Sequence, residues 1–285
     1  MKTVNKLRST YYNLSPPHRT RDPLGEAINQ DLSGNRFDRV QFKYDGQWAR
    51  LDVVGGVYTL TSRNGGVLKT GTFDVPEGAE PFPSLVRSTL VGEWMPPQSV
   101  WAQKNGLVGT FHPFDIVSTS TFDKRMKELD TAVWELAEFW IWPVKTFNAS
   151  LWLFAWRDYV DSGGWEGLVF KKSGGLFGEP VGRMKYEATV DLVCMGFNFN
   201  KKGEVRSIRA GVYADGELKE VCAVPVLLKI MKTSLKETGE TLLGCVLEVT
   251  GNGVFPSGAV RHPRFNRWRP EKDASECIQN EEVKS

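Results

Sequence analysis

A lysine and an aspartate stand two residues apart in the segment KYDG at 43–46, and their side chains could do chemistry. Apolar and polar residues alternate from Val40 to Asp45, which predicts a strand with one polar face that ends in a turn at Gly46. Side chains two apart on a strand are about 6–7 Å apart and point the same way, so Lys43 and Asp45 project together. A lysine held on a strand could act as a nucleophile. An exposed lysine beside a turn aspartate is the simpler interpretation of these residues alone, but later segments favour the nucleophile.

Other charged residues lie at strand ends or inside apolar strands. Arg63 stands in a tight turn at the end of a predicted strand, where an exposed arginine is also common. Glu93 lies inside an apolar run, and an acid in such a strand tends to be paired or functional. Glu166 begins another predicted strand, and Arg183 and Lys185 share one face of a later segment.

Two basic segments could contact phosphates. The first lies at 260–272 and contains Arg261, Arg264, Arg267, Arg269 and Lys272. Such a run is usually a solvated face, but Phe265 and Trp268 interrupt it, which suits contact with phosphates and nucleosides. The second is an N-terminal arm with no acid before Asp22, and it contains Lys2, Lys6, Arg8, Arg19 and Arg21. A solvated tail is the simpler interpretation of that arm, and a phosphate contact is the functional one.

Hydrophobic patterning predicts the elements that would position these residues. Strands are predicted at 48–53, 57–61, 88–94, 110–117 and 165–172. Apolar residues spaced by three and four up to Phe139 predict a helix over 123–139, with Asp123 as its N-cap, and a second helix is predicted over 150–160. After about residue 189, short strands and hairpin signals at 200–203 and 214–217 predict a small barrel of the OB type, with a domain boundary near 188.

Composition excludes several classes of protein. The chain has 285 residues, 41% of them hydrophobic, and a net charge of only +2, so a polyanion would have to bind at local basic patches. The four cysteines form no CxxC pair, which argues against a zinc site or a disulfide framework and fits a reducing compartment. We find no membrane span and no signal peptide, and we expect a cytoplasmic protein, in the host cytoplasm if it is viral.

Together these segments resemble the covalent nucleotidyltransferase superfamily, most closely its ATP-dependent DNA ligases, over residues 38–275. Seven segments in the family's order carry the resemblance: KYDG at 43–46, SRNG at 62–65, LVGE at 90–93, FDIV at 114–117, EGLVFK at 166–171, RMK at 183–185 and RHPRF at 261–265 running on to RPEK at 269–272. The resemblance implies an α+β fold. An adenylation domain of antiparallel sheets with flanking helices would cover 1–188, and an all-β OB-fold domain would cover 189–285.

The resemblance implies a reaction through a lysyl-AMP intermediate. AMP passes from ATP to Lys43, then to the 5′-phosphate at a nick, and leaves when the 3′-hydroxyl attacks. Arg63 and Glu93 would contact the nucleotide, and Phe114 would stack on adenine. The further nucleotide contacts would be Lys171, Arg183, Lys185, Arg269 and Lys272, the last two closing over the pyrophosphate. Glu166 and Asp45 would hold Mg²⁺ or Mn²⁺, and the DNA or phosphate contacts would be Arg50, Arg261, Arg264 and Arg267.

The sequence departs from the family pattern at two positions. The family commonly has arginine five residues after the nucleophile, where this chain has Trp48, and the nearest arginine is Arg50. Both lie on one strand face, so Arg50 is a hypothesis for the same phosphate contact. The second departure is Arg183, which stands where the family usually has lysine. Arginine keeps the charge but is planar and does not give up its proton.

The resemblance therefore implies a minimal DNA ligase, a monomer acting on nicked duplex DNA in repair, replication or recombination. An RNA ligase or an RNA-capping guanylyltransferase is the alternative within the superfamily. A non-catalytic OB module that binds nucleic acid is the alternative outside it. The RHPRF-to-RPEK segment favours DNA ligase, and the presence of Lys43, Glu93, Glu166 and Lys185 argues against loss of activity.

Overall fold

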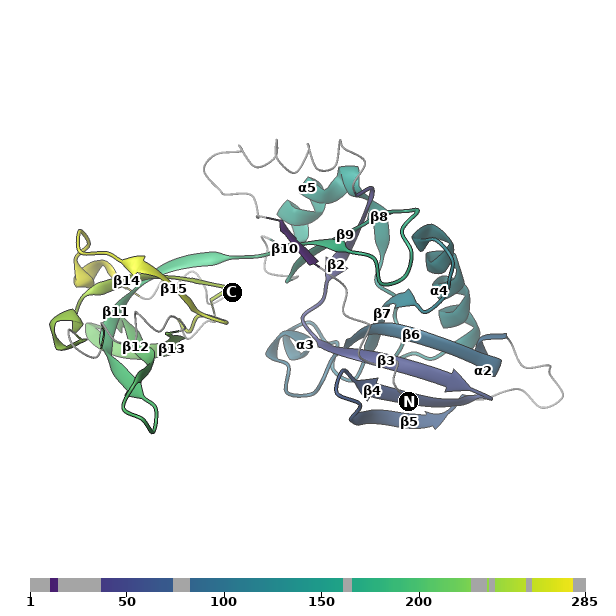
Figure 1. Cartoon of the computed structure of the whole chain (residues 1–285), viewed down its shortest axis with the longest axis horizontal. Coiled ribbons are helices and arrows are strands. Elements are labelled where there is room, and N and C mark those ends of the chain that lie inside the picture. The colour runs from purple at the N-terminus through teal and green to yellow at the C-terminus, as the bar shows by residue number, and fades with distance from the viewer. Residues whose placement is uncertain are drawn as a thin grey trace. The chain divides into compact units, whose positions relative to one another are not determined.

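The computed structural model describes residues 11–14, 37–73, 83–160, 166–226, 235, 239–254 and 258–278. The chain divides into two compact units, Met1–Lys185 and Tyr186–Ser285. All five cations of the predicted N-terminal arm lie outside the described residues. Figure 1 labels the elements within each unit.

One sheet of the first unit carries the predicted nucleophile. Its strands, in spatial order, are β1 (Tyr11–Leu14), β10 (Val181–Lys185), β9 (Gly167–Lys171), β2 (Arg39–Lys43) and β8 (Thr146–Asn148). β1 pairs with β10 in parallel, and the other neighbours are antiparallel. Val40, Phe170 and Met184 are fully buried in this sheet and anchor three adjacent strands.

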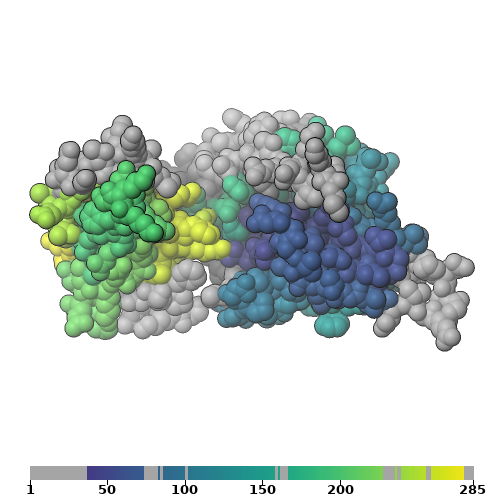
Figure 2. All heavy atoms as spheres, turned by 60° about the horizontal axis from the view of Figure 1, so that its bottom comes forward, coloured from purple at the N-terminus to yellow at the C-terminus, as the bar shows by residue number. Residues whose placement is uncertain are grey.

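The second sheet of this unit follows directly after Gly46. Its strands, in spatial order, are β5 (Val67–Thr72), β4 (Val57–Ser62), β3 (Gln47–Val54), β6 (Arg87–Trp94) and β7 (Phe111–Ile116), all antiparallel. Ala49, Leu51 and Val53 are fully buried, as the alternation of β3 predicts. β2 and β3 belong to different sheets, so the turn at Gly46 carries the chain from one sheet to the other. Figure 2 shows residues of β3, β4 and β5 gathered on one face, in purple to blue.

Short helices flank these sheets. They are α2 (Pro83–Val86), α3 (Val100–Lys104), α4 (Phe122–Leu136), the 3₁₀ turn η2 (Ala149–Leu151), α5 (Trp152–Ala155) and the π-helical turn η3 (Trp156–Val160). α4 lies against β7, and its Leu129 and Leu136 join the core of the second sheet. The helix predicted over 150–160 is therefore three short helical turns, each with a different hydrogen-bond pattern.

Two details of the predicted helix 123–139 are wrong. Its N-cap is Thr121, and the carboxylate of Asp123 instead accepts from Arg39, at 2.9 Å from Nε and 2.6 Å from Nη2. The helix ends at Leu136 because Ala137 takes a left-handed backbone conformation, with φ of 51°. Phe139 therefore lies beyond the helix, and 86% of it is exposed.

The second unit is built on one antiparallel sheet. Its strands, in spatial order, are β13 (Glu217–Pro225), β12 (Val205–Ala214), β11 (Ala188–Phe199), β14 (Val246–Gly251) and β15 (Arg264–Trp268), with short 3₁₀ turns η4 (Gly239–Leu242) and η5 (Ala274–Glu276). Asp215 and Gly216 both have positive φ, which is the geometry of the tight hairpin turn predicted at 214–217. Mostly antiparallel sheets with few helices thus make up the described fold. Across the described ranges no helix is long and apolar enough to cross a membrane.

Candidate active site

Both sheets of the first unit line a cavity of about 240 Å³. Seven residues predicted for the site line it: Lys43, Arg63, Glu93, Phe114, Lys171, Arg183 and Lys185. They come from six different strands or strand ends that span 143 positions of the sequence, from 43 to 185. The fold therefore gathers into one cavity residues that the sequence separates widely.

Glu166 holds two lysines at the edge of this cavity. Its Oε2 lies 2.6 Å from Nζ of Lys43, and its Oε1 accepts a hydrogen bond from Nζ of Lys185. Gly167 explains the placement, because it is the register partner of Lys43 on β2 and of Lys185 on β10. A Cβ at Gly167 would lie 2.1 Å from the carbonyl oxygen of Met184, so only glycine lets the strands pack this closely.

The charge of Glu166 depends on its two partners. Burial disfavours its ionised form, but the ammonium groups of Lys43 and Lys185 lower its pKa below the usual value. The side chain of Glu166 is only 5% exposed. A buried carboxylate that forms ion pairs with two lysines holds both amines in place, because breaking either pair would leave a buried charge without an opposite charge beside it.

Glu93, which lines the cavity, titrates differently from Glu166, which is bonded to two lysines of the lining without lining the cavity itself. Burial is the main reason that the pKa of Glu93 is raised to about 7, and the charge of Glu166 contributes to the rise. Lys43 and Arg63 oppose this rise. Two neighbouring carboxylates with pKa values displaced in opposite directions are typical of functional sites.

A buried ion-pair cluster supports the cavity beside Phe114. Arg125 on α4 donates to both oxygens of Asp115, at 2.7 Å and 3.2 Å. Nζ of Lys171 lies 3.1 Å from the carbonyl oxygen of Phe114 and 3.5 Å from Oδ2 of Asp115. Gln41 also donates to the Phe114 carbonyl, at 3.2 Å. The strand that carries Phe114 is thus tied to two other strands and a helix.

Sequence reasoning gave Lys171 a phosphate contact and gave Arg125 no role. Lys171 is 6% exposed, its amine contacts Asp115 and the Phe114 carbonyl, and burial lowers its pKa. A signal for Arg125 was present, because it lies three residues after Phe122 and four before Leu129 on the buried face of α4. A cation at a core position of a helix indicates a buried partner.

The sequence predicts site roles for Arg50 and Asp45, which do not line the cavity, and gives no role to Trp48, which does. Arg50 does not line the cavity, and its Nε and Nη2 donate to Asp52 at 2.9 Å and 2.8 Å. Asp45 is partly buried and is not among the lining residues either. Trp48 does line the cavity, with its ring centroid 5.6 Å from Cζ of Arg63. The hypothesis that Arg50 replaces the missing arginine thus has no support from the cavity geometry.

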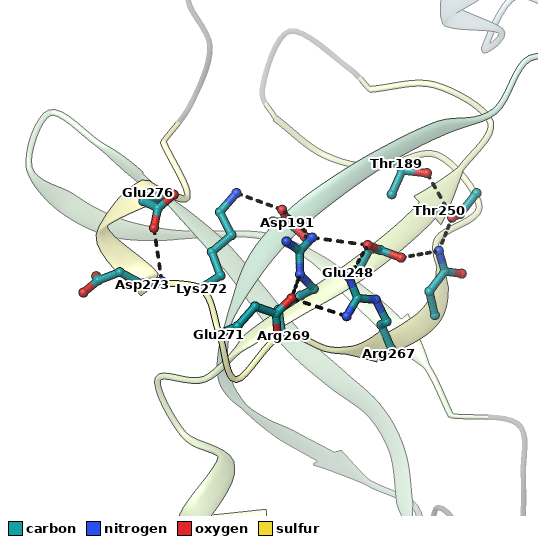
Figure 3. A network of polar contacts seen from close by, with 11 residues as sticks. Thr189, Asp191, Glu248, Thr250, Arg267, Arg269, Glu271, Lys272, Asp273 and Glu276 are labelled. Atoms are coloured by element: carbon teal, nitrogen blue, oxygen red, sulfur yellow. Dashed lines mark hydrogen bonds and ion pairs between the residues drawn. The ribbon is translucent and has the colours of Figure 1, made fainter. Parts of the chain in front are cut away.

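The remaining predicted cations lie in the second unit, and three of them, Arg267, Arg269 and Lys272, belong to one network of ion pairs (Figure 3). Arg269 Nη1 lies 3.2 Å and 3.3 Å from the oxygens of Asp191 and 3.3 Å from Oε2 of Glu248. Nζ of Lys272 lies 2.8 Å from Oδ2 of Asp191. Arg267 lies 3.4 Å from Glu248, the residue that faces it across β14 and β15. Acids of the same unit therefore already bind these cations.

The other residues of this basic segment are less accessible to a nucleoside than their sequence pattern predicts. Arg264 forms an ion pair with Glu187, and Arg261 is partly buried. Phe265 and Trp268 pack on the core of the unit, with their ring centroids 5.4 Å apart. The two aromatic side chains thus serve the core of this sheet.

No metal site is preformed in the part of the chain that the structure describes, where no group of three or more His, Cys, Asp or Glu side chains gathers. Glu166, predicted to hold Mg²⁺, has an ammonium group on each oxygen. The carboxylates described here therefore do not form a Mg²⁺ site by themselves.

Comparison with solved structures places this geometry in a known fold. The structure named "Pmar-Lig_PreS3" is similar with a TM-score of 0.64 at 14% identity, over 92% of this chain and 67% of that one. "Pmar-Lig_Pre." gives 0.63 at 18% identity, over 90% and 67%. A structure described as "DNA binding with a minimal scaffold: Structure-function analysis of Lig E DNA ligases" gives 0.58 at 17% identity, over 81% and 92%.

The chain has the fold of DNA ligases. The sequence itself matches no protein-family model and no curated protein. At such low identity, the likeness identifies the fold, and the chemistry has to be argued from the residues in the cavity.

Proposed function

We propose that this protein is an ATP-dependent DNA ligase that seals nicks in duplex DNA through a lysyl-AMP intermediate. The observation that carries the proposal is the placement of Lys43 at a cavity edge, with its amine fixed by Glu166 at 2.6 Å. The cavity is lined by further cations and by Phe114, which suits a nucleotide with a flat base and a charged triphosphate.

In the first proposed step, Lys43 becomes joined to AMP. Its ammonium loses a proton, for which the bonded Glu166 carboxylate is an acceptor within reach. The free amine attacks the α-phosphorus of ATP, so that a phosphorus–nitrogen bond forms, the bond to pyrophosphate breaks and pyrophosphate leaves with the electron pair. Lys185 and Arg63 would stabilise the charge that spreads over the phosphate oxygens.

In the two later steps the AMP is transferred and released. An oxygen of the 5′-phosphate at the nick attacks the AMP phosphorus, and the phosphorus–nitrogen bond to Lys43 breaks. The 3′-hydroxyl then loses its proton and attacks the 5′-phosphorus, and AMP departs as the phosphodiester forms. Each step is a displacement at phosphorus, so one set of cations can serve all of them.

Mg²⁺ belongs to this proposal as a companion of ATP. It would neutralise phosphate charge when bound. Because Mg²⁺ is commonly held by one or two carboxylates together with substrate phosphates, the nucleotide would supply most of its ligands. Glu166 could join them only by releasing one of its two lysines.

We assign the adenylation domain to 1–188 and the OB-fold domain to 189–285. The five-stranded antiparallel sheet of the second unit and its basic segment support this assignment. We propose nicked duplex DNA as the partner of the protein, which would act as a monomer. Arg269 and Lys272 would serve the nucleotide, and Arg261, Arg264 and Arg267 would serve DNA phosphates, once they exchange their present acidic partners for phosphate oxygens.

Labelled ATP tests the proposal directly. The protein is incubated with α-labelled ATP and Mg²⁺, and covalent label is measured after denaturation. We expect label on the wild type and on Lys219→Ala, which removes an exposed lysine of the second unit, and none on Lys43→Ala. Label that survives in Lys43→Ala would refute the proposed nucleophile, and label from GTP alone would favour capping.

The acceptor is tested on nicked duplexes with DNA or RNA on either side of the break. Sealing of the all-DNA nick supports a DNA ligase. Sealing confined to nicks flanked by RNA would identify an RNA ligase instead. Binding to nucleic acid without label or sealing would identify a non-catalytic module.

A further inference from the structure

Arg63 is held in the cavity in a different way from the cations around it. Lys43 and Lys185 donate to Glu166, and Lys171 and Arg125 contact Asp115. Within the described ranges, Arg63 forms no ion pair with a carboxylate. Its guanidinium carbon lies 5.6 Å from the centroid of the Trp48 indole. Its charge also opposes the rise in the pKa of Glu93.

The strand register places these side chains in a row. Ala49 on β3 faces Ser62 on β4, so the preceding residue, Trp48, lies next to Arg63 just beyond that pair. On its other side Trp48 faces Glu93 of β6. Arg63, Trp48 and Glu93 all line the cavity, and the strand that carries Trp48 lies between the strands that precede Arg63 and carry Glu93.

A guanidinium held by an aromatic face keeps its hydrogen-bond donors. Arginine has five N–H donors in one plane, and an ion pair uses some of them, whereas contact with a ring face uses none. The donors of Arg63 therefore remain available to phosphate oxygens, for which the planar fork of arginine is well suited. A direct salt bridge between Arg63 and Glu93 would remove that availability.

We propose that Trp48 is a positioning residue that holds Arg63 over the cavity for the polyphosphate of the nucleotide. The inference rests on the proposed function, and it assigns a contact with the phosphates of ATP to the pair formed by Trp48 and Arg63. Trp48 stands where the resembling family commonly has an arginine, and Arg63 lies beside it at the end of the neighbouring strand.

Four proteins test the inference in a cycle: wild type, Trp48→Ala, Arg63→Ala and the double variant. The rate of label transfer from ATP is measured across ATP concentrations, and melting temperatures check that each variant folds. We expect Trp48→Ala to raise the KM for ATP by about threefold to tenfold, with kcat changed by less than about twofold, because cation–π contacts have modest energies. In the Arg63→Ala background, removing Trp48 is expected to change KM no further.

Two further variants sharpen the result. Trp48→Phe keeps an aromatic face and is expected to restore most of the ATP affinity lost in Trp48→Ala. Trp134→Ala removes a tryptophan that is 75% exposed on α4, and it is expected to match the wild type. Effects of Trp48→Ala and Arg63→Ala that multiply in the double variant would overturn the inference, because Trp48 would then act independently of Arg63.

The failure of this inference is distinguishable from the failure of the proposed function. If the wild type takes no label from ATP, the proposed function fails. If it takes label that depends on Lys43 but Trp48→Ala behaves like the wild type, the role of Trp48 fails alone.

Discussion

The cavity of the first unit and the basic segment of the second use cations in opposite ways. In the cavity, one buried carboxylate, Glu166, serves both Lys43 and Lys185, so cations exceed the acid that holds them. In the second unit, Arg269 alone contacts three acids, Asp191, Glu248 and Glu271, and these acids also pair with Arg267 and Lys272, so each of the three cations has an acidic partner. The comparison teaches that a cluster of basic residues in a sequence does not show whether its charge is available to a ligand.

The strand register of the sheet in the second unit gives a reason for the position of Arg269. Asp191 on β11 and Glu248 on β14 face each other directly, and like charges opposite one another destabilise a sheet. Arg269 contacts both acids and relieves that repulsion. The cations of this segment therefore stabilise their own sheet, and a polyanion would have to displace these contacts before binding to them.

The largest expected effect comes from Glu166→Gln. The neutral amide does not offset the charge of the two ammonium groups. Lys43 therefore loses its fixed position, and the two lysines repel each other with no negative charge between them. We expect the rate of label transfer from ATP to fall by about 100-fold or more, since misplacing a nucleophile by 1 Å costs about that much. Glu128→Gln changes a partly buried acid of α4 that accepts from Ser120 and does not line the cavity, so this control should keep its rate. A rate within threefold of wild type would contradict the role of Glu166.

A pair of aspartate variants contrasts the stability of the two regions. Asp115→Asn leaves Arg125 and Lys171 buried without a carboxylate, and we expect a loss of about 3–5 kcal/mol in the free energy of unfolding. Asp191→Asn removes the ion pairs with Arg269 and Lys272 and also the repulsion from Glu248, so we expect a loss of at most about 1 kcal/mol. Denaturant titration measures both. Equal losses of unfolding free energy in the two variants would contradict the expected difference between the two regions.

Glu93 gives the cavity a dependence on pH. Its pKa rises from about 4.5 to about 7 on folding, so the folded state binds the proton more tightly and the stability from this group is lost as pH rises across that range. Glu93→Gln removes this dependence. We expect the difference in unfolding free energy between wild type and Glu93→Gln to change by a few kcal/mol at most between pH 4.5 and 7, in favour of the wild type at low pH. A difference that is constant with pH would contradict the raised pKa.

The smallest effect is expected from Arg50→Ala. Arg50 lies outside the cavity lining and pairs with Asp52 two residues away on the same strand. We expect label transfer within about twofold of wild type and a stability loss below about 1 kcal/mol, as for other partly exposed pairs. The rate assay that is used for Trp48→Ala checks it. A tenfold loss in rate would contradict this expectation and would support a role for Arg50 in the active site.

Local patterns predicted many of the strands. Alternation in β3 predicted its buried face, because period-two patterning depends on neighbouring residues alone. Turn signals placed Lys43 and Arg63 at strand ends and an apolar run placed Glu93 inside a strand, but only the family resemblance implied that the three belong to one site. Partners far apart in the sequence escaped prediction. Arg269 and Asp191 are 78 residues apart, and only the strand register brings them together.

Two other features had no clear local signal. The helix end at Leu136 depends on a left-handed alanine, a conformation that the sequence gives no reason to expect. The role of Trp48 depends on Arg63 of the next strand, so its position in the motif, considered alone, indicated only a missing arginine.

The central claim is that Lys43 carries AMP, and mass spectrometry of the ATP-treated protein tests it most directly. After reaction with ATP and Mg²⁺, the protein is digested under conditions that preserve phosphorus–nitrogen bonds, and the modified peptide is sequenced. We predict the mass of one AMP on the peptide that contains Lys43, and its loss when nicked DNA is added. AMP on another residue, or an unmodified protein, would contradict the account.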